Sequence, residues 1–214
     1  MRLSLALMVA LCLQGAVDPK VEQAARLFER IWKEYFKSRG EVYQAPILTA
    51  FTGKQGSACG KVNPGNAYYC DKDNTVYYDA DFLAALRLRV ASETGTSGEA
   101  APVIAIAHEL GHAVFAQMNR QARPRGAMQQ LQGYGEEKVA DCLAGALTRA
   151  AAEQRVLAAG TLAEAEATIA IIGNLNARKG HPAWRVRYDS FLSGYRNGVN
   201  ACEPNPLENL RYRR

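Results

Sequence analysis

The residues with the clearest chemistry are His108, Glu109 and His112, which place two imidazoles and a carboxylate within five positions. Residues four apart on a helix rise from one face, so the two histidines are spaced to bind the same metal ion. Glu109 lies to one side of that pair, where it can take a proton from a water that the metal activates. This HExxH pattern predicts a zinc site with His108 and His112 as ligands and Glu109 as general base.

The residues around the motif predict the helix that it needs, over residues 102 to 119. Pro102 suits a first helical position, and an apolar stripe follows at three- and four-residue spacing. The stripe consists of Val103, Ile106, Leu110, Val114 and Gln117. Gly111 lowers the stability of such a helix by roughly 1 kcal/mol relative to alanine. We therefore expect another element, carrying the third ligand, to approach closely at Gly111.

Glu137 is the best candidate for the third ligand. Asp141 follows it by one helical turn and can accept the spare N–H of a ligating imidazole, which fixes the orientation of that ring. Ala140, Ala144 and Gly145 are small enough to let this second helix lie close to the first. Two histidines and one carboxylate with an open fourth position form the ligand set of a catalytic zinc.

Two of these assignments have alternatives. Glu137, like Glu136 beside it, could be a solvated acid in the first turn of a helix, and Glu136 or Asp141 would then be next in line as ligand. Negative charge on a substrate carbonyl oxygen needs a further donor, for which His181, beside Pro182 in an expected loop, is the candidate. A lone histidine is as often structural as catalytic.

Residues 108 to 112 and 137 to 145 together resemble the bacterial putative neutral zinc metallopeptidase family, a zincin-type group with a glutamate third ligand. The resemblance covers most of residues 43 to 203. Its other segments are 58 to 60, 68 to 73 and 76 to 79, then His181, 185 to 194 and Cys202. This chain departs from the family at Ala113 and Asp71, where histidine and proline are common. The resemblance implies an edge strand beside the metal helix that pairs with an extended peptide substrate.

The remaining patterns predict an α+β, zincin-like domain, mostly helical with a small antiparallel sheet. Helices are expected at residues 18 to 37, 81 to 90, 161 to 177 and 183 to 197. Strands are expected at residues 42 to 51, 67 to 70 and 75 to 79, with Pro46 at an edge or a strand start. Loops are expected at residues 91 to 101 and 120 to 125, the latter basic and either solvated or able to steer an acidic substrate.

Residues 1 to 16 predict a secretory signal peptide, because Arg2 precedes an apolar run that is too short to span a bilayer. The mature catalytic domain, residues 17 to 214, would be periplasmic or secreted, without a transmembrane span. An uncleaved anchor is the alternative because the cleavage site is poorly marked. Leu11 before Cys12 is too bulky for a lipid-modification site.

Four cysteines remain after such a leader, and an even number in an exported chain favours disulfides. Cys59 and Cys70 flank a turn-rich segment that closes easily, which favours Cys59–Cys70 and, by elimination, Cys142–Cys202. A cysteine metal site is the alternative, but the chain contains no CxxC motif.

These patterns together predict an exported metallopeptidase that binds one Zn²⁺ ion, although manganese, iron or cobalt could occupy the same ligands. A formal net charge of +5 is too small to indicate nucleic acid as a partner. The alternative from another class is a catalytically silent envelope module, for binding or scaffolding, that keeps the metal for stability. Glu109 argues against it, because a purely structural zinc needs no base.

Overall fold

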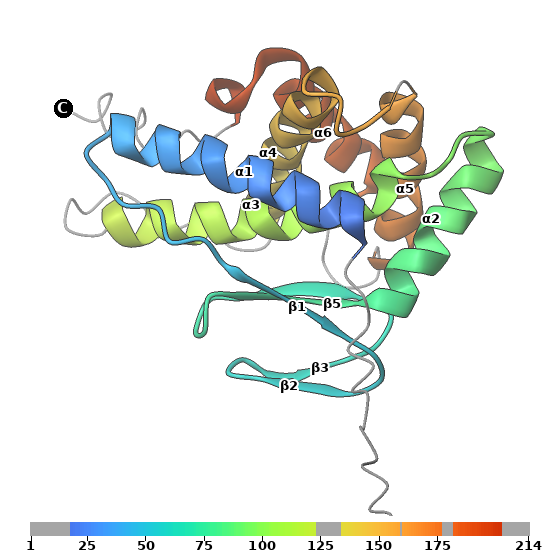
Figure 1. Cartoon of the computed structure of the whole chain (residues 1–214), viewed down its shortest axis with the longest axis horizontal. Coiled ribbons are helices and arrows are strands. Elements are labelled where there is room, and N and C mark those ends of the chain that lie inside the picture. Colours follow the sequence, from blue (N-terminus) through green and yellow to red (C-terminus); the bar gives the residue numbers. More distant parts are fainter. Residues whose placement is uncertain (1–17, 123–133, 159, 177–181, 203–214) are drawn as a thin grey trace, which may run out of the picture.

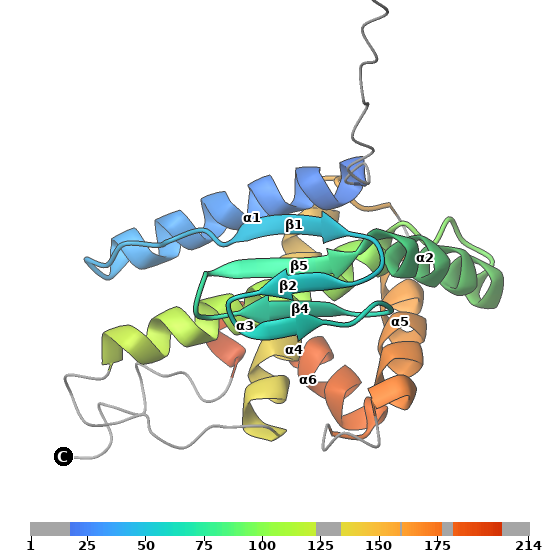
Figure 2. The same cartoon turned by 90° about the horizontal axis from the view of Figure 1, so that it is seen from below.

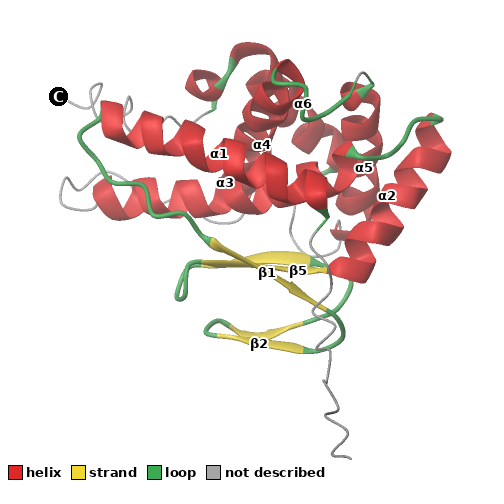
Figure 3. Ribbon diagram, in the orientation of Figure 1, coloured by secondary structure: helices red, strands yellow, loops and turns green. Residues whose placement is uncertain are grey.

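The structure is a computed structural model that describes residues 18–122, 134–158, 160–176 and 182–202, and in these residues helices stack on a small sheet (Figures 1 and 3). The helices are α1 (Pro19–Ser38), α2 (Ala80–Thr94), α3 (Ala100–Ala122), α4 (Tyr134–Glu153), α5 (Thr161–Asn176) and α6 (Trp184–Asn197), with a 3₁₀ turn η3 (Val199–Ala201). The strands are β1 (Ile47–Phe51), β2 (Gln55–Ser57), β3 (Gly60–Val62), β4 (Ala67–Cys70) and β5 (Thr75–Asp79). The prediction of a mostly helical α+β fold is confirmed.

The three-stranded sheet is mixed, so the prediction of an antiparallel sheet was wrong. Its strand order is β1-β5-β4, and β5 is antiparallel to β4 but parallel to β1. A parallel pair needs a long connection, and here the chain forms the separate β2–β3 hairpin and then β4 before it reaches β5. All five residues of β5 are buried, because α3 covers one face of the sheet and the hairpin covers the other (Figure 1).

The strand β4 forms one edge of the sheet and faces α4, α5 and α6, whereas β1 forms the edge beside α1 (Figure 2). The backbone N–H of Asp79 donates to the carbonyl of Asn66 at 3.0 Å, which sets the hydrogen-bonding register of the β4–β5 pair. In an antiparallel pair these bonds alternate along the strand. Ala67 and Tyr69 therefore point their backbone N–H and C=O groups away from β5, toward the helices.

The helix α3 lies at the centre of the core and is two to three residues longer at each end than expected, so that Arg120 is helical. Its first turn is held by Glu164 of α5, whose buried carboxylate accepts from the backbone N–H of Ala100 at 2.6 Å and of Gly98 at 3.1 Å. The helix before it, α2, continues to Thr94, so the loop expected from residue 91 starts only at residue 95. Gly95, with φ of 70°, ends α2 in the left-handed conformation.

Small residues allow α4 to pack closely on both sides. A Cβ on Gly111 of α3 would lie 2.7 Å from the carbonyl oxygen of Ala140, so the close approach expected at Gly111 is present. Gly145, which was expected to face α3, instead faces α6, where a Cβ would overlap the backbone of Phe191. Gly194 of α6 in turn has no room for a Cβ against α4. The helix that carries Glu137 is thus fixed between α3 and α6.

Two disulfides link the elements, in the pairs favoured by the sequence. Cys59–Cys70 joins the β2–β3 hairpin to the end of β4, and Cys142–Cys202 joins α4 to the residue after η3. Among the described helices, none combines the length and apolar composition that crossing a membrane requires. The expected leader, residues 123 to 125 of the basic loop, and His181 lie outside the described residues.

Candidate metal centre

The helices α3 and α4 bring together the side chains of His108, His112 and Glu137, called the metal triad below. The Nε2 atoms of the two histidines are 3.1 Å apart. Each Glu137 carboxylate oxygen lies 3.5 Å from the Nε2 of one of them. Zinc bonds of about 2.0–2.1 Å place tetrahedral ligands about 3.3 Å apart, so these spacings fit one zinc ion.

A carboxylate orients each imidazole from behind. Asp141 Oδ1 lies 2.8 Å from the Nδ1 of His108, and Glu136 Oε1 lies 3.2 Å from the Nδ1 of His112. When Nδ1 carries the proton and donates it to the carboxylate, the Nε2 lone pairs of both rings point at the same place. The lone pairs of two Nε2 atoms 3.1 Å apart repel each other unless a proton or a metal ion lies between them. The orientation of the rings therefore suits a shared metal ion.

Asp141 lies where it was expected, whereas the position of Glu136 differs from its predicted solvated role. The structure places Glu136 about one-third exposed, with its carboxylate against His112. The sequence gave no clear signal for the contact between Glu136 and His112, because acidic residues are common in the first turn of a helix.

Arg187 of α6 is a site residue that was not predicted from the sequence. It is 4% exposed, and its Nε and Nη2 donate to the two carboxylate oxygens of Asp141, both at 2.8 Å. Its Nη2 also lies 3.3 Å from the ring nitrogens of His108 and 3.7 Å from the carboxylate of Glu137. The sequence signal that could have identified Arg187 is its place one turn before Phe191. It lies on the face of α6 that the aromatic residues predict to be buried.

The charges of the site favour a cation at the metal triad. Burial alone would lower the pKa of His112, but hydrogen bonds that its ring donates to Glu136 and Glu137, together with the charges of Glu109 and Glu137, raise that pKa to about 10. Burial would raise the pKa of Glu137, but the two histidines beside it hold that pKa well below its usual value. The field that favours a proton on His112 also favours a divalent ion, which binds by displacing the proton.

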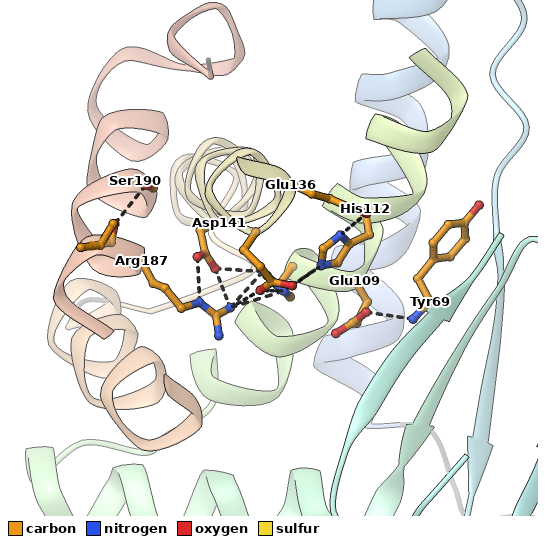
Figure 4. Close-up of polar contacts among 10 residues, drawn as sticks. Tyr69, Glu109, His112, Glu136, Asp141, Arg187 and Ser190 are labelled. Carbon is orange, nitrogen blue, oxygen red and sulfur yellow. Dashed lines mark hydrogen bonds and ion pairs between the residues drawn. The ribbon is translucent and has the colours of Figure 1, made fainter. Parts of the chain in front are cut away.

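Glu109 lies beside the metal triad and is held by the edge of the sheet. Its Oε2 accepts a hydrogen bond from the backbone N–H of Tyr69 at 2.9 Å (Figure 4). Tyr69 is one of the two β4 residues whose backbone groups point away from β5, so the edge strand and the carboxylate meet at this bond. The bond fixes the direction of the Glu109 side chain.

A cavity of about 720 Å³ opens onto the metal triad, Glu109 and the β4 edge. Its other walls come from α2, α5 and α6 and from the turns of α3 on either side of the histidines. The metal triad is thus reached from a space large enough for part of a peptide chain, with Glu109 and the backbone of β4 on its wall.

The model of one protein family, described as putative neutral zinc metallopeptidase, matches residues 20–198, which include every residue of this site. The chain belongs to this family. The chain is also similar to YpfJ of Escherichia coli K12, named an uncharacterized protein, which is 29% identical to it over 195 residues. The uncharacterized protein Rv2575 of Mycobacterium tuberculosis H37Rv is 30% identical over 132 residues.

The match with YpfJ covers 84% of this chain but 66% of YpfJ. The match with Rv2575 covers 60% of this chain but 43% of Rv2575. The chain therefore spans less than two thirds of the length of either relative. No solved structure matches the chain.

Proposed function

We propose that the chain is a zinc-dependent metallopeptidase that hydrolyses peptide bonds. The observation that carries this proposal is a metal triad whose three side chains surround one point, with Glu109 beside it and an open cavity in front. A purely structural zinc would take a closed set of four ligands and would need neither the base nor the cavity. Membership of a zinc peptidase family supports the same class of reaction.

We assign His108, His112 and Glu137 as the ligands of one Zn²⁺ ion, with Asp141 and Glu136 holding the two imidazoles. Zinc held by these residues would act as a Lewis acid toward a substrate carbonyl and would lower the pKa of a water toward about 7. Arg187 balances the charge of Asp141, so that the buried carboxylate can accept a hydrogen bond from the Nδ1–H of His108.

Glu109 acts as general base and then as general acid. It takes a proton from the attacking water and passes it to the amine that leaves when the peptide bond breaks. Because Oε2 is held by the Tyr69 N–H, Oε1 is the oxygen that handles the proton. We keep His181 as the candidate donor to the carbonyl oxygen, where negative charge develops in the transition state.

The substrate would lie extended along β4. The β4–β5 register leaves the backbone N–H and C=O groups of Ala67 and the C=O of Tyr69 outside the β4–β5 pair, and both residues line the cavity, which suits main-chain pairing with a peptide strand. A peptide held in this way passes the carboxylate of Glu109, because the Tyr69 N–H that donates to this carboxylate belongs to the same strand edge.

The test is metal analysis of the purified protein together with cleavage of casein and of a peptide library, with and without chelator. We expect about one zinc per chain and cleavage that the chelator abolishes and zinc restores. Zinc bound without any cleavage would instead support the silent binding or scaffolding module.

We also propose that the chain is exported, with residues 1 to 16 as a cleaved signal peptide. The two disulfides support this, because such bonds persist in oxidising compartments. Peptide mapping without reduction, combined with N-terminal sequencing of protein from the periplasm or medium, tests both points. Free thiols throughout, or an intact leader, would contradict them.

A further inference from the structure

We infer that Arg120, with Asn119 beside it, binds the main chain of the substrate about three residues before the cleaved bond. The inference rests on the proposed peptidase function and adds that the site takes an extended segment of a longer chain, rather than the first residue or two of a peptide. Its evidence is the unused polar groups of these two side chains, the charges around them and the direction of β4.

The cavity follows α3 from Ile104, one turn before His108, to Asn119 and Arg120 near the end of the helix. Arg120 comes eight residues after His112, and eight residues of helix span about 12 Å. Side chains on a helix tilt toward its N-terminus, so the guanidinium reaches back toward the metal triad. An extended peptide advances about 3.3 Å per residue, which places Arg120 about three residues from the metal.

The guanidinium of Arg120 is held at the cavity wall by Tyr69. Burial raises the pKa of the Tyr69 hydroxyl, and a hydrogen bond from the Arg120 side chain partly offsets that rise. The hydroxyl donates its own proton to Oδ1 of Asn74 at 3.0 Å, so its oxygen is left to accept from Arg120. The described part of the chain gives Arg120 no carboxylate partner. Because a guanidinium carries five N–H donors, donors of Arg120 remain for a ligand in the cavity.

Asn119 has an amide that the fold leaves partly unused. The residue lines the cavity, and its Oδ1 has no hydrogen-bond partner among the described residues. A side-chain amide offers both donors and an acceptor, and each peptide group of a substrate offers one of each. The amide of Asn119 therefore matches a peptide main chain.

The charges at this end of the cavity favour recognition of the main chain over a charged side chain. Arg120 shares this end with Glu136 and Asp71, whose side chains also line the cavity. A substrate carboxylate would be attracted by Arg120 but repelled by the two acids, and a substrate ammonium would meet the reverse. A peptide carbonyl has no net charge, so it can accept a charge-assisted hydrogen bond from the guanidinium without such repulsion.

The direction of β4 decides which part of the substrate reaches Arg120. β4 begins beside the start of α2, because Asp79, the N-cap of α2, pairs with Asn66 just before β4. It runs from there to Tyr69, which holds Glu109. Antiparallel pairing is the more stable arrangement, so a substrate strand would run the opposite way. The part of the substrate before the cleaved bond then lies toward Arg120.

Cleavage of a peptide series by the zinc-loaded protein tests the inference. The peptides share one sequence after the cut and carry one to four alanines before it, with an acetylated N-terminus. We expect kcat/KM to rise about tenfold or more once the segment before the cut reaches about three residues. Arg120→Met and Asn119→Leu should each lose much of this rise. Arg89→Met is the matched control, because Arg89 is an exposed arginine of α2 that does not line the cavity, so the rise should stay as in the parent.

Two changes to the longest peptide test whether the main chain is recognised. Aspartate or lysine in place of the third alanine before the cut should change kcat/KM by no more than about threefold. An alkene isostere of the peptide bond that carries the carbonyl of this residue should lower kcat/KM about tenfold in the parent, but little in Arg120→Met. A preference for aspartate that Arg120→Met abolishes, or an equal rise with length in Arg120→Met and the parent, overturns the inference.

Binding to the zinc-loaded Glu109→Gln protein separates failure of this subsite from failure of the proposed peptidase. In calorimetric titration the peptide with four alanines before the intended cut should bind about tenfold or more tightly than the peptide with one. Adding Arg120→Met should remove most of this difference. If the parent protein cleaves nothing, the peptidase proposal fails, whereas the titrations still test the subsite. Equal binding of the two peptides, or a difference that Arg120→Met leaves unchanged, overturns the inference.

Discussion

Gly111→Ala tests whether the contact between α3 and α4 sets the geometry of the metal triad. A Cβ at residue 111 would lie 2.7 Å from the carbonyl oxygen and 2.9 Å from the Cα of Ala140. Ordinary contacts between such atoms lie near 3.5 Å, so the helices would have to separate by about half an ångström or more. Because His108 and His112 lie on one helix and Glu137 on the other, this movement widens the metal triad.

Two opposing effects determine the stability of this variant. Alanine in a helix interior is about 1 kcal/mol more favourable than glycine. Overpacking of a tight interface costs about 1–3 kcal/mol, and here the neighbour is backbone, which cannot rotate away. We therefore expect the free energy of unfolding of the metal-free protein to fall by roughly 1 kcal/mol, with zinc binding weakened about tenfold or more.

Urea denaturation of the metal-free protein and competitive zinc titration measure the two effects. Ala140→Gly supplies the control, because it removes only a Cβ and leaves the backbone atoms that residue 111 would meet. Adding it to Gly111→Ala should restore neither stability nor zinc affinity. A Gly111→Ala protein that is more stable than its parent and binds zinc equally well would refute the role assigned to this contact.

Three further predictions follow from buried charges. Arg187→Met leaves the buried carboxylate of Asp141 without its bidentate partner and should lower the free energy of unfolding, measured by urea denaturation, by about 3–5 kcal/mol. Adding Asp141→Asn should recover part of this loss. A single Arg187→Met variant as stable as the parent would contradict the pairing. Glu164→Ala leaves buried N–H groups at the start of α3, including that of Ala100, without their acceptor and should cost about 2–4 kcal/mol, a prediction refuted by an unchanged denaturation midpoint. Since the pKa of His112 is raised to about 10 without metal, zinc must displace its proton at pH 7, and affinity should fall about tenfold for each unit by which the pH drops. Calorimetry in buffers of different ionisation enthalpy should show proton release, and pH-independent zinc binding would contradict it.

The same pKa shift fixes how His112 contributes to folding of the metal-free protein. A group whose pKa is raised in the folded state stabilises that state fully below its unfolded pKa of about 6.5, and this contribution is lost as the pH rises toward 10. Glu137, whose pKa is lowered, behaves in the opposite way and loses its contribution as the pH falls.

Local patterns predicted those features that depend on residues near one another in the sequence. The spacing of His108 and His112 and the single turn from Glu137 to Asp141 follow from the helical repeat, and the structure brings these side chains together. Gly111 indicated a close approach because glycine in mid-helix needs such a reason. The even cysteine count and a turn-rich segment favoured the same two disulfides that the structure contains.

The features that were missed depend on tertiary packing. Arg187 reaches Asp141 across 46 residues, and nothing local indicates which buried acid an arginine on α6 will meet. The direction of β1 depends on the path of the hairpin that follows it, so strand propensity alone could not distinguish parallel from antiparallel pairing. The hydrogen bond from the Tyr69 N–H to Glu109 was missed because every residue except proline has a backbone N–H, so the amino-acid sequence does not indicate which one Glu109 binds.

Zinc titration of the parent, Glu109→Gln and Glu137→Gln proteins under identical conditions, with peptide turnover measured on the same samples, tests the central claim most directly. Glu109→Gln should bind zinc nearly as tightly as the parent but lose about 10²- to 10⁴-fold in turnover, because its amide cannot accept the proton of the attacking water. Glu137→Gln should lose both zinc affinity and turnover, because it removes the anionic ligand of the metal triad. If Glu137→Gln binds zinc as tightly as the parent, or if Glu109→Gln retains full turnover, the assignment of ligand and base to these two glutamates is wrong.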